Sequence, residues 1–125
     1  MIVGIGTDIV AVARIARLYQ RHGARALEKL LAPPEFDELS KASDYARFLA
    51  KRFAAKEAFG KALGIGVAAP ASMSNIVVTH DDLGKPTFAY LPPLARYLAG
   101  RGLSAHLSIS DEADYALAFV VMESA

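Results

Sequence analysis

The segment over residues 44–63 constrains the fold of this 125-residue chain most, because it carries the longest clear helical repeat. Its apolar positions recur at helical spacing and form one stripe: Phe48, Ala55, Phe59 and Leu63. Gly64 follows directly, and glycine commonly ends a helix. The sequence therefore predicts one long central helix.

Shorter elements are predicted on both sides of this helix. Apolar and branched runs indicate strands at Ile2–Thr7, 75–79, 87–90, 104–110 and 115–122, with a hairpin turn at 111–114 between the last two. Short helices are expected from Val12 to an interruption at Gly23, after Pro33-Pro34, and over 92–98. One strand, then helices, then strands is typical of an α+β fold, with a small antiparallel sheet packed against helices. We expect one domain over residues 1–125.

Composition narrows the class of protein. The 14 Lys and Arg against 13 Asp and Glu give a net charge of +1, which disfavours a nucleic-acid binder. Hydrophobic residues make up 54% of the chain and the mean hydropathy is +0.27, so we expect some apolar surface to meet another subunit. Cysteine is absent, which excludes thiol chemistry. Neither a signal peptide nor a membrane span is predicted, so we expect a cytoplasmic protein.

Asp8 stands out because it follows the apolar strand at 2–7, where a carboxylate must be capped, paired or bound to a cation. One interpretation is an N-cap for the next helix, since aspartate is a favoured capping residue. The other is a ligand site. Gly4 and Gly6 allow close backbone approach, but the segment lacks the full dinucleotide-binding fingerprint.

Glu57 is the second candidate, on the long helix. Glu57 and Lys61 are i, i+4 neighbours, and such a pair is usually a solvated ion pair on a helix surface. Gly60 argues against an ordinary surface, because glycine inside a helix costs about 1 kcal/mol relative to alanine. A glycine at this position often means that something must pass close to it.

His106 is the third candidate. Alternation along 104–110 places it on one strand face with Ser108 and Ser110. A polar face of this kind indicates a cleft or an interface, and no nucleophile elbow is present to support a hydrolase triad.

Four arginines at spacings of 3, 4 and 4 residues form one basic ridge, the last of them beyond the interruption at Gly23: Arg14, Arg17, Arg21 and Arg25. Such a ridge is often only a solvated helix face. In a chain of net charge +1 it also suits docking of an acidic partner.

Together these segments resemble the holo-acyl-carrier-protein synthases, the small trimeric type of 4′-phosphopantetheinyl transferase. The matching segments are Ile2–Ile9 with Arg14, the helix Phe48–Gly64 with its F-x-x-K-E-A-x-x-K element, Gly84–Pro86, and His106–Ser110. Asp111 departs from the pattern, because many relatives carry histidine there.

The resemblance implies transfer of 4′-phosphopantetheine from coenzyme A to a serine of apo acyl carrier protein, in support of fatty acid biosynthesis. It implies that Asp8 and Glu57 bind Mg²⁺, an ion that takes one or two carboxylates plus phosphate oxygens. It implies that Lys61 neutralises phosphate charge. Lys85, Pro86 and His106 would contact coenzyme A, and the arginine ridge would bind the acidic carrier.

The resemblance further implies a homotrimer with sites between subunits. The base that deprotonates the serine stays open between Glu57, Asp8 acting through water, and His106. Two rival functions are a nucleotide-binding trimer without turnover and an interaction module built on the arginine ridge. Neither rival explains why Asp8 and Glu57 are present together.

Overall fold

The structure is a computed structural model that describes all 125 residues. Its elements in chain order are β1 (Ile2–Ala11), α1 (Val12–His22), α2 (Ala24–Leu30), α3 (Glu35–Ser40), α4 (Tyr45–Leu63), the 3₁₀ turn η1 (Met73–Asn75), β2 (Ile76–His80), β3 (Pro86–Tyr90), α5 (Pro92–Gly100), β4 (Leu103–Asp111) and β5 (Tyr115–Ser124). The α+β expectation is confirmed. None of the helices is both long and apolar enough to cross a membrane.

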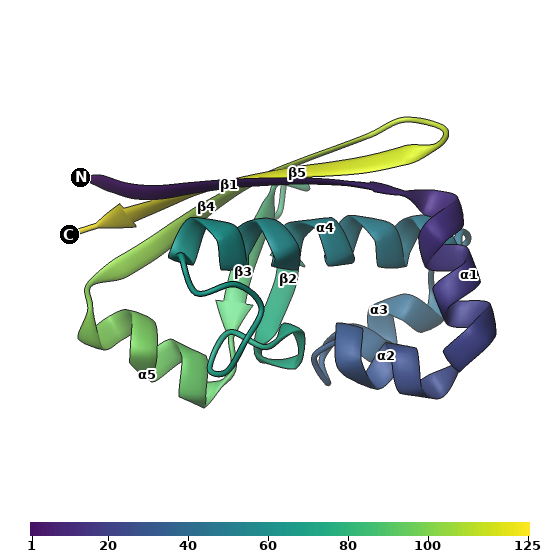
Figure 1. Cartoon of the computed structure of the whole chain (residues 1–125), viewed down its shortest axis with the longest axis horizontal. Coiled ribbons are helices and arrows are strands. Elements are labelled where there is room, and N and C mark those ends of the chain that lie inside the picture. Colours follow the sequence, from purple (N-terminus) through teal and green to yellow (C-terminus); the bar gives the residue numbers. More distant parts are fainter.

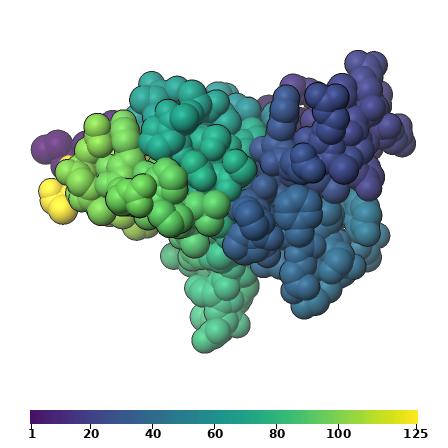
Figure 2. All heavy atoms as spheres, turned by 90° about the horizontal axis from the view of Figure 1, so that it is seen from below, coloured from purple at the N-terminus to yellow at the C-terminus, as the bar shows by residue number.

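The helix α4 is central, as predicted. It lies between a three-stranded antiparallel sheet, in the order β1-β5-β4, and a layer made of the other helices and the β2–β3 hairpin (Figure 1). Asp44 caps its start by accepting a hydrogen bond from the Arg47 backbone N–H at 3.0 Å, and Gly64 ends it in a left-handed conformation. The strands β2 and β3 form a separate antiparallel pair, and this hairpin projects from the body in Figure 2.

Two glycines let β1 lie directly against α4. A Cβ atom at Gly4 would come within 1.9 Å of the Ala62 carbonyl oxygen, and one at Gly6 within 2.0 Å of the Ala58 carbonyl oxygen. No side chain fits in that space, so the close approach suggested by these glycines is confirmed. It brings the first half of β1 directly against the second half of α4.

The strand β1 is longer than the sequence suggests. It continues through Asp8 to Ala11, because residues 8–11 pair with residues 115–118 of β5. Ala11 occupies the N-cap position of α1, and no side chain caps that helix. The interpretation of Asp8 as a helix cap is therefore wrong.

Gly60 also has the predicted close neighbour. A Cβ atom there would lie 2.7 Å from the Gly66 carbonyl carbon, because the loop after α4 folds back over the helix. The Gly66 N–H donates to the Gly60 carbonyl at 3.1 Å, which fixes this return.

A buried ionic network ties α4 to the helical layer. The Glu35 carboxylate accepts hydrogen bonds from Lys56 Nζ, from Arg52 Nη1 at 2.7 Å and from the Val78 backbone N–H at 3.0 Å. Lys56 also donates to the carbonyls of Leu30 and Met73. Burial lowers the pKa of Lys56 to about 8, although Glu35 opposes that shift.

Glu35→Gln should lower the free energy of unfolding by about 3 kcal/mol at pH 7, because it leaves two buried cations without their shared carboxylate. Urea denaturation measures this change. Asp37→Asn on the same helix is the matched control, since its ion pair with Lys41 is largely exposed and is expected to contribute little. Equal, small losses for both variants would contradict the structural role of the network.

The outer face of the three-stranded sheet carries no covering element (Figure 1). Its exposed apolar side chains, 37–63% accessible, are Val3, Ile5, Ile9, Tyr115, Leu117 and Phe119. A continuous apolar patch of this kind usually marks an interface.

Candidate active site

Asp8 projects from β1 toward α4 rather than toward solvent. Its side chain is only 17% exposed. Oδ1 lies 3.3 Å from Lys61 Nζ, whereas Oδ2 is buried and has no hydrogen-bond partner. A buried carboxylate oxygen without a partner is costly, so this atom is a place where a cation or donor is expected.

Glu57 lies half-buried on α4, near Asp8. Burial raises the pKa of the Glu57 carboxyl, and the negative charge of Asp8 raises it further. The positive charges of Lys61 and Arg14 act in the opposite direction. The structure therefore brings together the two carboxylates that the sequence singled out, with two cations beside them.

Lys61 does not form the solvated ion pair with Glu57 that is usual at this spacing on a helix surface. Its ammonium instead donates to the Thr7 carbonyl at 2.9 Å and to Asp8. The reason is the close approach of β1, which places strand oxygens within reach of α4. Lys61 thus belongs to a cluster formed by two elements, not to a solvated helix face.

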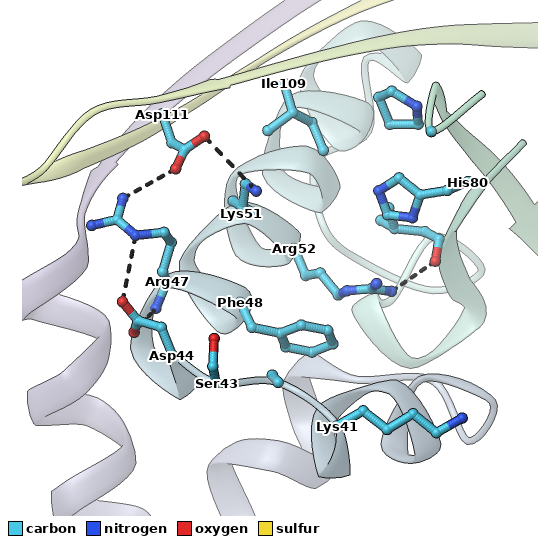
Figure 3. A pocket seen from close by; sticks show the side chains of 14 residues that line it. Lys41, Ser43, Asp44, Arg47, Phe48, Lys51, Arg52, His80, Ile109 and Asp111 are labelled. Carbon is cyan, nitrogen blue, oxygen red and sulfur yellow. Dashed lines mark hydrogen bonds and ion pairs between the residues drawn. The ribbon is translucent and has the colours of Figure 1, made fainter.

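A hollow of about 490 Å³ lies on another side of α4, bounded by the β2–β3 hairpin and the end of β4 (Figure 3). Its basic lining residues are Lys41, Arg47, Lys51, Arg52 and His80. Phe48 lies in the wall and stacks on Arg52, whose guanidinium carbon is 4.3 Å from the ring centre. This hollow has the aromatic and cationic groups that suit a phosphorylated nucleotide.

Pro86 lines this hollow, whereas Lys85 is absent from its lining. The Lys85 side chain is exposed, and its backbone N–H donates to Asp81 at 2.9 Å. The structure therefore places one of these two residues at the candidate pocket.

Asp111 is more than a turn residue. It ends β4 and binds Arg47 Nη1 at 3.1 Å, with Lys51 3.8 Å away (Figure 3). Arg47 also donates to the carbonyls of Glu112 and Ala113, so it clamps the β4–β5 hairpin to α4. Sequence reasoning overlooked Arg47 and Lys51, although their i, i+4 spacing already placed them on one face of the long helix.

His106 lies on the outer face of the sheet with Ser108 and Ser110, as the alternation predicted. Its Nε2 is 2.8 Å from Glu123 Oε1, and this hydrogen bond lowers the pKa of the Glu123 carboxyl. Asp8 lies on the inner face, and β5 separates its strand from β4. Within one chain, His106 and Asp8 are therefore not brought together.

The predicted arginine ridge is exposed along α1 and α2. Arg14, Arg17 and Arg21 line one hollow of about 220 Å³, and Arg25 lines a neighbouring one of about 380 Å³. Phe53 contributes to both hollows, and the Arg14 guanidinium lies 5.5 Å from its ring centre. The ridge begins beside Glu57 and has an apolar floor.

A family model described as the 4′-phosphopantetheinyl transferase superfamily matches residues 4–120, which include Asp8, Glu57, Lys61 and His106. The chain belongs to this superfamily. It is 62% identical to a holo-[acyl-carrier-protein] synthase of Dechloromonas aromatica, over all of both chains.

Solved structures agree with this membership. The transferase fold matches the crystal structure of holo-[acyl-carrier-protein] synthase from Neisseria meningitidis with a TM-score of 0.96 and 49% identity, covering 99% of this chain and all of that one. It matches the Bacillus anthracis synthase, solved in complex with CoA (3′,5′-ADP), with a TM-score of 0.84 and 36% identity over 100% and 99% of the two chains. The transferase is thus a holo-[acyl-carrier-protein] synthase by family, and the resemblance seen in its motifs is confirmed.

Proposed function

We propose that this enzyme transfers 4′-phosphopantetheine from coenzyme A to a serine of apo acyl carrier protein and releases adenosine 3′,5′-bisphosphate. The observation that carries the proposal is the cluster of Asp8, Glu57 and Lys61, in which one buried carboxylate oxygen has no partner. The names of the relatives and the coenzyme A complex of the Bacillus anthracis synthase support the two substrates.

Asp8 and Glu57 fit a Mg²⁺ ion. Their carboxylates lie close enough for one charge to raise the pKa of the other, and a cation between them removes that repulsion. Two protein carboxylates leave room for substrate phosphate oxygens and water, the ligand set that Mg²⁺ prefers. When bound, Mg²⁺ would polarise the pyrophosphate of coenzyme A and offset its developing negative charge.

The serine oxygen attacks the phosphorus that carries pantetheine, the bond from that phosphorus to the leaving bisphosphate breaks, and the serine proton passes to a base. Glu57 and Asp8 are the acceptors beside this site. Because His106 lies on the opposite face of the sheet, a role for His106 in the same reaction requires the histidine of another subunit. Lys61 would hold the substrate phosphates.

We place the nucleotide of coenzyme A in the hollow beside Pro86. Lys51 offers a cationic group there, His80 an imidazole ring and Phe48 an aromatic face. Lys85 lies outside this lining and would reach the nucleotide from the projecting hairpin.

The site is completed between subunits of a homotrimer, in our proposal. The apolar outer face of the sheet supplies the contact surface, and His106 lies on that same face. Association would therefore bring His106 of one subunit toward the coenzyme bound at another. We further propose that the whole domain, residues 1–125, acts in the cytoplasm in fatty acid biosynthesis.

The arginine ridge is the proposed docking surface for the acidic carrier protein. Guanidinium groups make bidentate contacts with carboxylates, and a charged row steers encounter. The ridge starts at Arg14 beside Glu57, so a carrier bound there presents its serine to the two carboxylates.

Arg14→Glu should raise the KM for carrier protein about tenfold or more, with the KM for coenzyme A nearly unchanged. Because Arg14 also acts on Glu57, Arg21→Glu repeats the test farther along the ridge. Arg96→Glu on α5 makes the same charge change away from the ridge and serves as the control. Steady-state kinetics at low and high salt measure the effect. If both ridge variants keep the wild-type KM for carrier protein at low salt, the ridge is only a solvated helix face.

The function itself is tested with purified enzyme, apo carrier protein, coenzyme A and Mg²⁺, by chromatographic detection of released adenosine 3′,5′-bisphosphate. Release of the bisphosphate that requires carrier protein, coenzyme A and Mg²⁺ together supports phosphopantetheine transfer. No release from folded enzyme would favour one of the two non-catalytic alternatives.

A further inference from the structure

The ammonium of Lys61 is hydrogen-bonded to β1, the strand that carries Asp8 of the candidate cation site. It donates to the Thr7 carbonyl at 2.9 Å and to Asp8 Oδ1 at 3.3 Å. The Lys61 side chain is 54% exposed, whereas that of Asp8 is 17% exposed. The lysine therefore covers an almost buried carboxylate from the solvent side.

The charges of this cluster balance without any added ion. Asp8 and Glu57 supply two negative charges, and Lys61 and Arg14 supply two positive ones. Arg14 lies over the Phe53 ring, so Lys61 is the cation in direct contact with Asp8. The second oxygen of Asp8 remains without a partner.

We propose that Lys61 is the internal counter-ion of Asp8 in the cation-free enzyme, and that it leaves Asp8 when a divalent cation binds there. The inference rests on the function proposed above. A lysine carries its charge on a flexible stem, and this one is half exposed, so it can change partner without moving α4. Once released, its ammonium is free for the phosphates of coenzyme A.

This exchange has two consequences. Lys61 competes with the cation for Asp8, so it weakens cation affinity in the absence of coenzyme. It also couples the two ligands, because the cation frees the group that coenzyme A then uses, and coupling between two bound ligands is reciprocal. Coenzyme A should therefore strengthen cation binding in the wild type beyond what shared phosphate ligands alone provide.

The experiment uses Mn²⁺ as a probe, with free ion followed by electron paramagnetic resonance and no carrier protein present. Lys61→Met should bind Mn²⁺ about tenfold more tightly than wild type without coenzyme A, since a unit charge beside the carboxylate is removed. Coenzyme A should then strengthen Mn²⁺ binding less in this variant than in the wild type. Lys61→Arg, which keeps the charge, should bind Mn²⁺ with an affinity close to that of the wild type.

Lys29→Met is the matched control, because this exposed lysine on α2 changes the net charge equally and contacts no residue of the cluster. Its Mn²⁺ affinity should equal that of the wild type. Unchanged or weaker Mn²⁺ binding by Lys61→Met overturns the inference while leaving the cation site in place. A different result would overturn the proposed cation site itself: equal Mn²⁺ affinities, in the presence of coenzyme A, for the wild type and for Asp8→Asn.

Discussion

Asp8→Asn should reduce phosphopantetheine transfer by about 1,000-fold while leaving the fold unchanged. Asparagine has the same shape but removes the charge that contacts Lys61 and that, in our proposal, binds the cation. Losing one electrostatic contributor of a phosphoryl-transfer site commonly costs two to three orders of magnitude in turnover. Glu57→Gln should have a similar effect, because it removes the second carboxylate.

The measurement is kcat/KM at saturating Mg²⁺, together with urea denaturation of each variant. Stability is expected to be retained, since Asp8 caps no helix and one of its oxygens has no partner to lose. Ser108→Ala, on the outer face, is a control for a polar substitution elsewhere on the same sheet. Near-normal turnover in both carboxylate variants would contradict the assigned cation site.

Phe119→Asp should give monomers in place of the homotrimer that we propose, and should lower transfer activity about 100-fold. Phe119 lies on β5, the middle strand, and its side chain points to the uncovered outer face. A carboxylate buried there between subunits is strongly unfavourable, whereas in a monomer it is solvated. The folded subunit should therefore persist without its partner.

Size-exclusion chromatography with light scattering measures the assembly, and circular dichroism checks the fold. The control is Leu83→Asp, the same chemical change at the tip of the β2–β3 hairpin, where the side chain is 96% exposed. That variant should keep the native assembly. An oligomeric, fully active Phe119→Asp protein would show that neither assembly nor the site depends on this face.

Periodicity predicted most of the fold, because the helices and strands here bury one face each. The helix α4 and its end at Gly64, the interruption at Gly23 and the β4–β5 hairpin all appear where the pattern placed them. The length of β1 was not predictable from its own residues. Its last residues are extended because β5, more than 100 residues away in sequence, pairs with them.

The site was predictable as a set of outliers but not as a geometry. Asp8 and Glu57 stood out because a carboxylate beside an apolar or glycine-rich segment is costly unless it is capped, paired or bound to a cation. The partner of Lys61 depended on how closely β1 approaches α4, and that is a tertiary property. Glu35 could not be singled out from the sequence, since a glutamate at the start of a short helix is ordinary until its four buried hydrogen-bond donors are known.

Phosphopantetheine transfer by this enzyme is measured most directly as the intact mass of apo acyl carrier protein after incubation with the enzyme, coenzyme A and Mg²⁺. We expect a mass gain of one phosphopantetheine group on wild-type carrier. We expect no gain on a carrier whose acceptor serine is alanine, and almost none with the Asp8→Asn enzyme. A wild-type carrier that stays unmodified in the presence of folded enzyme would contradict the proposed transfer.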